Sequence, residues 1–228
     1  MNLIAEAWAW LTDPAAWSEG GIPERIVQHL AVTVVVVVLA ALIALPTGLV
    51  VGHRRRGGGW VVATSGAARA IPTLGVLTLF ALWLGIGLLA PVLALVLLAI
   101  PPLIAGAYAG VAAIDRSIPE AARAIGMSEW QIVGRVEVPL AARTIVGGLR
   151  SATLQVVATA TLAAYTSDAG LGRYIIGGLK SRDYAEMIGG SMLVVALALI
   201  LDAAFALTLR LRVFHRTTSP RHHERTAV

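Results

Sequence analysis

Five long apolar runs alternate with short polar stretches along this chain of 228 residues. The runs cover approximately residues 26–52, 61–84, 88–112, 144–165 and 188–209. Each has the roughly 20 mostly apolar residues that a helix needs to cross the hydrocarbon layer of a membrane. The valine run at 34–38 would suit a buried strand, but a single strand in lipid leaves its backbone groups unpaired. The pattern therefore predicts an all-α membrane protein with about five transmembrane helices.

Prolines and glycines interrupt these runs at places where a helix should bend or stop. We expect Pro46 to kink the first helix, and Pro91, Pro101 and Pro102 to bend or break the third. The sequence "GIG" at 85–87 predicts a tight turn between the second and third helices.

Composition narrows the possible functions. With 57% hydrophobic and 14% charged residues, no large soluble domain fits beside the five spans. The chain has no cysteine, which excludes disulfides and thiolate chemistry. It contains no GxxxxGK[ST] phosphate loop and no HExxH or GxSxG motif with a partner histidine. We therefore expect that this chain is not an enzyme and binds no cofactor. The energy for transport must then come from another protein chain.

The basic residues are distributed unequally between the two sides of the expected membrane. Arg25, Arg173, Lys180 and Arg182 fall on one side. Fourteen of the 18 Lys and Arg residues fall on the other, at positions 54, 55, 56, 69, 116, 123, 135, 143, 150, 210, 212, 216, 221 and 225. The positive-inside rule then places the N-terminus outside and the C-terminus in the cytoplasm. This spread of charge over loops and a tail explains the net charge of +5 better than nucleic-acid binding does.

The polar stretch "IPEAARAIGMSEWQIVGRVEVPL", residues 118–140, lies between two of the apolar runs. Pro119 and Glu120 suit the first turn of a helix, and Gly126 should end it. A second helix should follow with Met127, Trp130, Val133 and Gly134 on one face, until Pro139 breaks the chain. We expect two short helices at the cytoplasmic surface.

Two interpretations of this loop remain open from its residues alone. Ala121, Ala122 and Ala124 form a small-residue face that another protein could approach closely, and Met127 and Trp130 could anchor in its groove. The loop could equally lie on lipid headgroups as an ordinary amphipathic segment.

The spacing of residues within this loop favours a protein partner over lipid headgroups. The triplet Glu120, Ala121, Ala122, then Gly126, then "VP" ending at Pro139, resembles the EAA loop of bacterial ABC importer permeases, with Val138 where that loop usually has Leu. The stretches "RAIPTLGVLTLFALWLGIG", "IPPLIAGAYAGVAAID", "TLAAYTSDAGLGRYIIGGL" and "LILD" look like the permease subunits of glycine betaine, choline and carnitine importers, the osmoprotectant group.

This resemblance implies the partners and the organisation of the chain. The loop at 115–141 would be a coupling helix seated in a cytoplasmic ATPase, with Glu120, Ala121, Ala122, Gly126, Met127, Trp130 and Pro139 as its contact residues. An ATP-binding subunit dimer carrying ATP and Mg, a second permease chain and an extracytoplasmic binding protein would complete the importer. Residues 1–25 would be an extracytoplasmic interfacial segment, 26–212 the transmembrane domain in the bacterial inner membrane, and 213–228 a basic cytoplasmic tail.

Polar residues inside the spans are candidates for the solute path. Thr153, Gln155 and Thr159 could line it, or could hydrogen-bond between helices. Tyr108 and Trp83 could stack on a quaternary ammonium cation, or could simply pack.

Asp202 is the one acid well inside an expected span, and we expect it to pair with an arginine near the cytoplasmic side. A secondary transporter or channel for a small polar solute is the alternative function, but it would call for further coupling acids in the spans. His222 and His223 lie on the basic tail, where we expect solvation rather than metal binding.

Overall fold

The structure is a computed structural model that describes residues 2–214, without the side chains of residues 68, 69 and 210–214. Its described part is entirely helical, as the apolar pattern predicts. The helices are α1 (Leu3–Thr12), η1 (Pro14–Trp17), α2 (Ile22–Arg54), α3 (Gly58–Ala70), α4 (Thr73–Leu84), α5 (Leu89–Ala112), α6 (Ser117–Ala124), α7 (Glu129–Ile132), η2 (Val133–Glu137), α8 (Val138–Thr159), η3 (Ala160–Tyr165), α9 (Gly172–Ser181) and α10 (Tyr184–Phe214).

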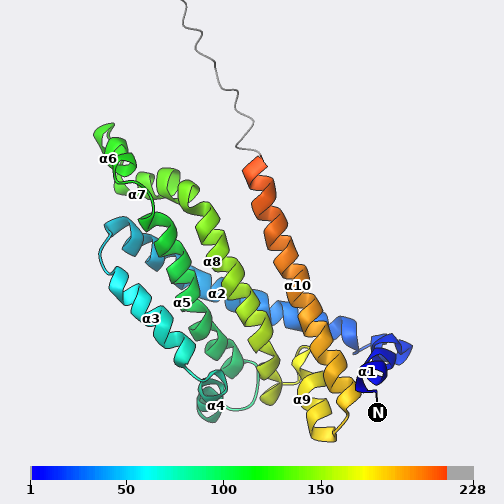
Figure 1. Cartoon of the computed structure of the whole chain (residues 1–228). Helices are drawn as coiled ribbons and strands as arrows, with labels where there is room; N and C mark the ends of the chain where they lie inside the picture. Colours follow the sequence, from blue (N-terminus) through cyan, green and yellow to red (C-terminus); the bar gives the residue numbers. More distant parts are fainter. Residues whose placement is uncertain (1, 215–228) are drawn as a thin grey trace, which may run out of the picture.

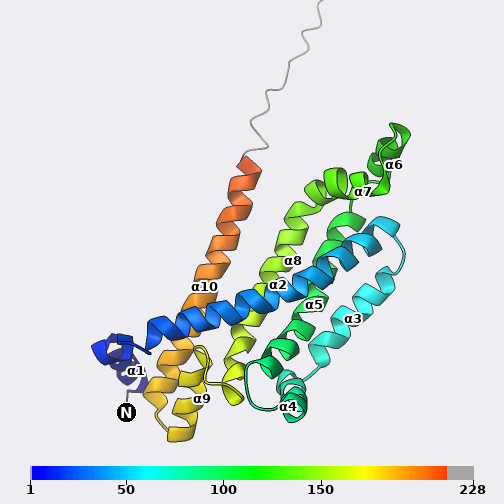
Figure 2. The same ribbon diagram turned by 180° about the vertical axis from the view of Figure 1, so that it is seen from behind.

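The helices α2, α5 and α8 form the packed centre of the molecule. Figure 2 shows α2 crossing α5 and α8 obliquely, while α10 runs beside α8 and contacts α1 and α9 near its start. The short helices α6 and α7 lie at one end of the bundle, and α1 and α9 lie at the other (Figure 1). The first described residues and the α6 segment are therefore at opposite ends.

Within residues 2–214, four helices, rather than five, are long and apolar enough to cross a membrane: α2, α5, α8 with its flanking turns, and α10. The expected span at 61–84 is instead two shorter helices, α3 and α4, separated at Ile71 and Pro72. Ile71 adopts an extended backbone because a residue before proline is hindered from the helical conformation. Hydropathy alone could not distinguish this broken pair from a continuous span.

Three prolines lie inside continuous helices. Pro46 lies in α2, and Pro101 and Pro102 lie in α5, so these prolines do not break either helix, and the bend expected at each stays a prediction. Pro91 falls in the first turn of α5, where a missing N–H costs no helical bond. Neighbouring helices compensate for the lost bonds in membrane proteins more readily than in soluble ones.

Glycine and alanine hold the central helices together at very short range. A Cβ on Gly48 would lie 2.7 Å from the Cβ of Ala107, and one on Gly106 would lie 2.7 Å from the Cα of Gly148. The surrounding core is lined by Val36, Ala40, Ala44, Leu95, Ala99, Leu103, Ala152 and Val156. The glycines thus set the distance between α2, α5 and α8.

The end of the bundle opposite α6 is closed by polar contacts to one loop. Arg25 and Arg173 both pair with Asp168, and the Gln28 amide oxygen accepts a hydrogen bond from the N–H of Gly170 at 3.0 Å. Trp10 of the N-terminal segment packs edge-on against Tyr174, with ring centroids 5.0 Å apart. These contacts join α1, α2 and α9.

Asp202 of α10 is paired with Arg150 of α8, which confirms the expected arginine partner. The Arg150 Nε and Nη2 atoms donate to the two carboxylate oxygens at 2.6 and 2.8 Å. This two-bond geometry fixes the rotation of one helix relative to the other. The pair therefore attaches α10 to the centre of the bundle.

Replacement of Gly148 with valine should destabilise the protein by about 1–3 kcal/mol, because the added atoms overlap the backbone of Gly106. Thermal unfolding in detergent, followed by circular dichroism, measures the effect. Gly147→Val is the matched control, since a Cβ there meets no atom within 4 Å. Equal unfolding temperatures for the two variants would contradict this packing.

Asp202→Asn should lower the unfolding temperature by leaving the Arg150 guanidinium without its carboxylate. The double variant with Arg150→Gln should recover part of the loss, because it removes the uncompensated charge as well. A double-mutant cycle in detergent tests this. Strictly additive effects would show that the pair contributes no coupling energy.

Candidate coupling loop

The segment from Asp115 to Ser128 folds as a short helix closed by a glycine turn. The Asp115 carboxylate accepts bonds from the Ser117 hydroxyl at 2.7 Å and the Ser117 N–H at 2.9 Å. These bonds hold the pKa of Asp115 below its ordinary value. At the other end, Gly126 has a φ of +87°, and its N–H donates to the carbonyl of Arg123. The left-handed conformation explains why glycine occupies this position.

The second half of the loop does not end at Pro139, as was expected. Ser128 and Gln131 form a capping box at the start of α7. The helix then continues through the π-helical turn η2 into α8, with Pro139 in the first turn of α8. Proline has no N–H to donate to the carbonyl four residues before it, and that carbonyl belongs to a residue of the π turn. Trp130, on α7, is therefore joined rigidly to a membrane helix.

The exposed surface of the loop differs in part from the expected contact face. Glu120, Ala121 and Ala124 are exposed, whereas Ala122 is buried against the chain itself. Met127 is half-buried and Trp130 is 79% exposed. Ile125 was missed by sequence reasoning although it is 80% exposed. Its place directly before the glycine turn is the signal that could have identified it.

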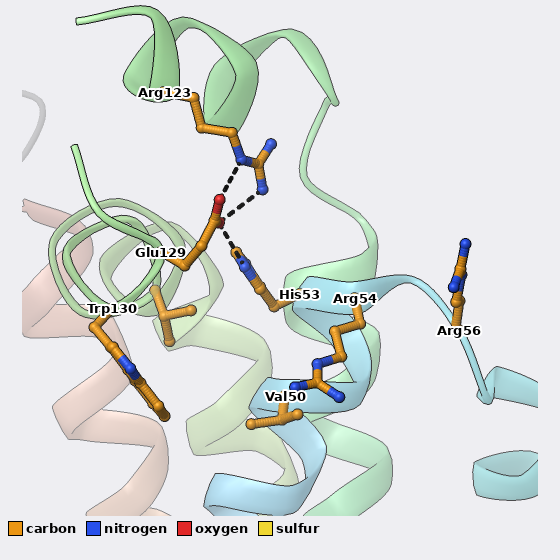
Figure 3. Close-up of a pocket in the computed structure, with 8 residues that line it drawn as sticks. Val50, His53, Arg54, Arg56, Arg123, Glu129 and Trp130 are labelled. Carbon is orange, nitrogen blue, oxygen red and sulfur yellow. Dashed lines mark hydrogen bonds and ion pairs between the residues drawn. The ribbon is translucent and has the colours of Figure 1, made fainter. Parts of the chain in front are cut away.

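A polar network joins the loop to the end of α2, and Figure 3 shows its exposed part. Arg123 donates to both Glu129 oxygens at 2.8 and 2.9 Å, and the His53 Nε2 lies 2.9 Å from Glu129 Oε2. The Glu129 carboxylate raises the pKa of Arg123. His53 Nδ1 lies 2.8 Å from Glu137 Oε2. From the sequence, His53 was read only as part of a polar stop after the first span.

A cavity of about 650 Å³ lies beside this network. Its walls are formed by Val50, His53, Arg54, Arg56, Arg123, Glu129, Trp130 and Val133. Figure 3 shows Trp130 and Val50 on its lower side and the ion pairs above. The cavity is thus lined both by the end of α2 and by residues of α6 and α7.

The candidate path residues do not form one group. Thr153 and Thr159 donate to carbonyls of their own helix at 2.8 and 2.7 Å. Gln155 reaches the Leu98 carbonyl of α5 at 3.5 Å. Tyr108 lies against Gly58. It follows Leu98 by ten residues on α5, which places these two residues about 15 Å apart along the helix. Trp83 is 78% exposed on α4.

Among the described residues no group of three or more His, Cys, Asp or Glu side chains could hold a metal ion. His222 and His223 lie outside the described residues.

Comparisons with known proteins identify the family. Residues 37–218 match the binding-protein-dependent transport system inner membrane component family. The glycine betaine/carnitine/choline transport system permease protein OpuCB of Bacillus subtilis is 32% identical over 183 residues, which cover 80% of this chain and 84% of that protein. The osmoprotectant import permease protein OsmW of Salmonella typhimurium is 31% identical over 77% of this chain and 84% of its own length.

Solved structures agree on the fold. The MetNI methionine ABC transporter in an inward-facing conformation has a TM-score of 0.73 at 22% identity, covering 88% of this chain and 98% of that one. The match to the family extends over most of the chain and includes residues 115–141. The chain therefore belongs to the family of binding-protein-dependent transport system inner membrane components.

Proposed function

We propose that this chain moves a small compatible solute such as glycine betaine, choline or carnitine across the inner membrane. The family consists of the membrane permeases of ABC importers, in which a separate subunit hydrolyses ATP. The names of the relatives that cover four fifths of the chain support this substrate class. An extracytoplasmic binding protein would deliver the solute, and a second permease chain would complete the path.

The loop at 115–141 would transmit the work of ATP hydrolysis, and its exposed turn is the observation that carries this assignment. The helices α6 and α7 lie at one end of the bundle (Figure 1), and Glu120, Ala121, Gly126 and Trp130 of this segment are exposed. An exposed tryptophan and isoleucine beside small residues suit a groove on another protein. Closure of the ATPase dimer on ATP and Mg would push this loop.

Charge supports an orientation with this loop in the cytoplasm. Arg54, Arg55, Arg56, Arg116 and Arg123 lie around the cavities at the α6 end. At the opposite end are Arg25, Arg173, Lys180 and Arg182. The N-terminus would then be outside, with 1–25 as an interfacial segment and 26–212 as the transmembrane domain. Most of the expected tail, 213–228, lies outside the described residues.

The tagged chain, extracted gently from its native membrane, should bring an ATPase with it. Altering both Glu120 and Gly126 should reduce the recovered ATPase, because both residues lie on the exposed α6 end of the loop. Mass identification of the captured proteins measures this. Transport by the purified chain alone, in liposomes without ATP, would contradict the importer assignment and favour a secondary transporter.

Gly126→Leu should uncouple ATP hydrolysis from uptake while the chain still inserts into the membrane. A leucine at a φ of +87° costs about 1–2 kcal/mol, which disfavours the present turn by a factor of roughly 5 to 30. Solute uptake and ATP hydrolysis are measured together in proteoliposomes holding the full complex. Gly59→Leu is the control, because Gly59 lies outside this loop, has no positive φ, and a Cβ there meets no atom within 4 Å. Unchanged uptake per ATP in Gly126→Leu would count against the coupling role.

A further inference from the structure

His53 contacts two carboxylates that belong to different parts of the coupling loop. Its Nε2 faces Glu129, at the start of α7, and its Nδ1 faces Glu137, in the π turn before α8. The distances are 2.9 and 2.8 Å, and the histidine side chain is 13% exposed. One imidazole ring therefore bridges the two ends of a helical segment from the last turn of α2.

The two contacts together define the protonation state that this geometry needs. Carboxylates only accept hydrogen bonds, so both ring nitrogens must donate. A neutral imidazole carries one N–H and can satisfy only one of the two carboxylates. The doubly protonated ring satisfies both, and it also balances the charge of Glu137, which is 2% exposed.

The connection continues from His53 to α6 through paired charges. Arg123, in the last turn of α6, holds Glu129 through two hydrogen bonds. The series Arg123, Glu129, His53, Glu137 thus links α6, α7, α2 and the π turn. A cavity of about 650 Å³, lined by residues of α2, α6 and α7, lies beside this network.

The π turn is a second observation that points to the same place. A π-helical turn inserts one residue into a helix and occurs frequently at functional sites. Here it comprises Val133–Glu137 and ends on the buried glutamate that receives the His53 bond. The helix thus departs from regular geometry at the position where it meets α2.

We propose that His53 is a positioning residue that transmits movement of the coupling loop to α2 through its hydrogen bonds to Glu129 and Glu137. This inference rests on the proposed function of the loop. Pushing α6 displaces Glu129 through Arg123, and the imidazole moves the end of α2 with it. Without the doubly bonded ring, Glu129 and Glu137 would lose these two side-chain links to α2.

The experiment uses the full importer complex in proteoliposomes and measures ATP hydrolysis and solute uptake in the same vesicles. His53→Gln keeps a single donor group, and His53→Arg keeps a permanent positive charge with several donors. His53→Ala with Glu137→Gln removes the bridge without leaving a charged glutamate buried. Arg54→Gln is the matched control, since it removes a neighbouring positive charge that forms no ion pair among the described side chains.

We expect His53→Gln and the double variant to retain ATP hydrolysis while uptake per ATP falls about tenfold, the size typical of a broken coupling between neighbouring groups. His53→Arg and Arg54→Gln should keep most of the uptake per ATP. Wild-type uptake per ATP in His53→Gln would overturn the proposal. Failure of the unmodified chain to bind an ATPase would overturn the proposed function instead, so the two failures are distinguishable.

Discussion

Close contact between glycines is the constraint on which the rest of this fold depends. In lipid there is no hydrophobic force to drive one apolar helix against another, so stability must come from packing at short range. The contact of Gly106 with Gly148, and of Gly48 with Ala107, brings α5 against both α8 and α2. This spacing places the end of α2 within reach of the π turn, and the polar network at His53 follows from it. Larger residues at these glycines would separate the two ends of the network.

Much of the architecture could be predicted from the sequence because hydropathy reports directly on membrane crossing. The runs that became α2, α5, α8 and α10 are long, and glycine-rich or polar segments separate them. The second run was wrong as a single span because the effect of Pro72 is local and steric, and an average over 20 residues hides it. Pro101 and Pro102 show the converse, since the same residue type was tolerated within α5. Only the surrounding helices decide between the two outcomes.

The loop was predicted in outline for a different reason. Gly126, Glu120 and Pro119 carry conformational information of their own, so the helix and its turn could be read directly. The partners of Asp202 and His53 depend on which helices meet, and spacing along the chain gives no such information. Arg150 was expected only as some arginine, and the pair of Glu129 and Glu137 around His53 was not foreseen at all. A histidine between two helices becomes informative only when both neighbours are known.

The π turn has one further consequence for how this segment can vary. A helix that contains it holds one residue more than an α-helix spanning the same length. Loss of one residue anywhere within Val133–Glu137 would restore a regular helix and leave α7 and α8 in nearly the same relative orientation, because the wider turn absorbs the extra residue. Glu129 and Trp130 would keep their directions, whereas the residues of the shortened turn, Glu137 among them, would change theirs. The extra residue in this turn therefore determines where Glu137 points and not where α7 points.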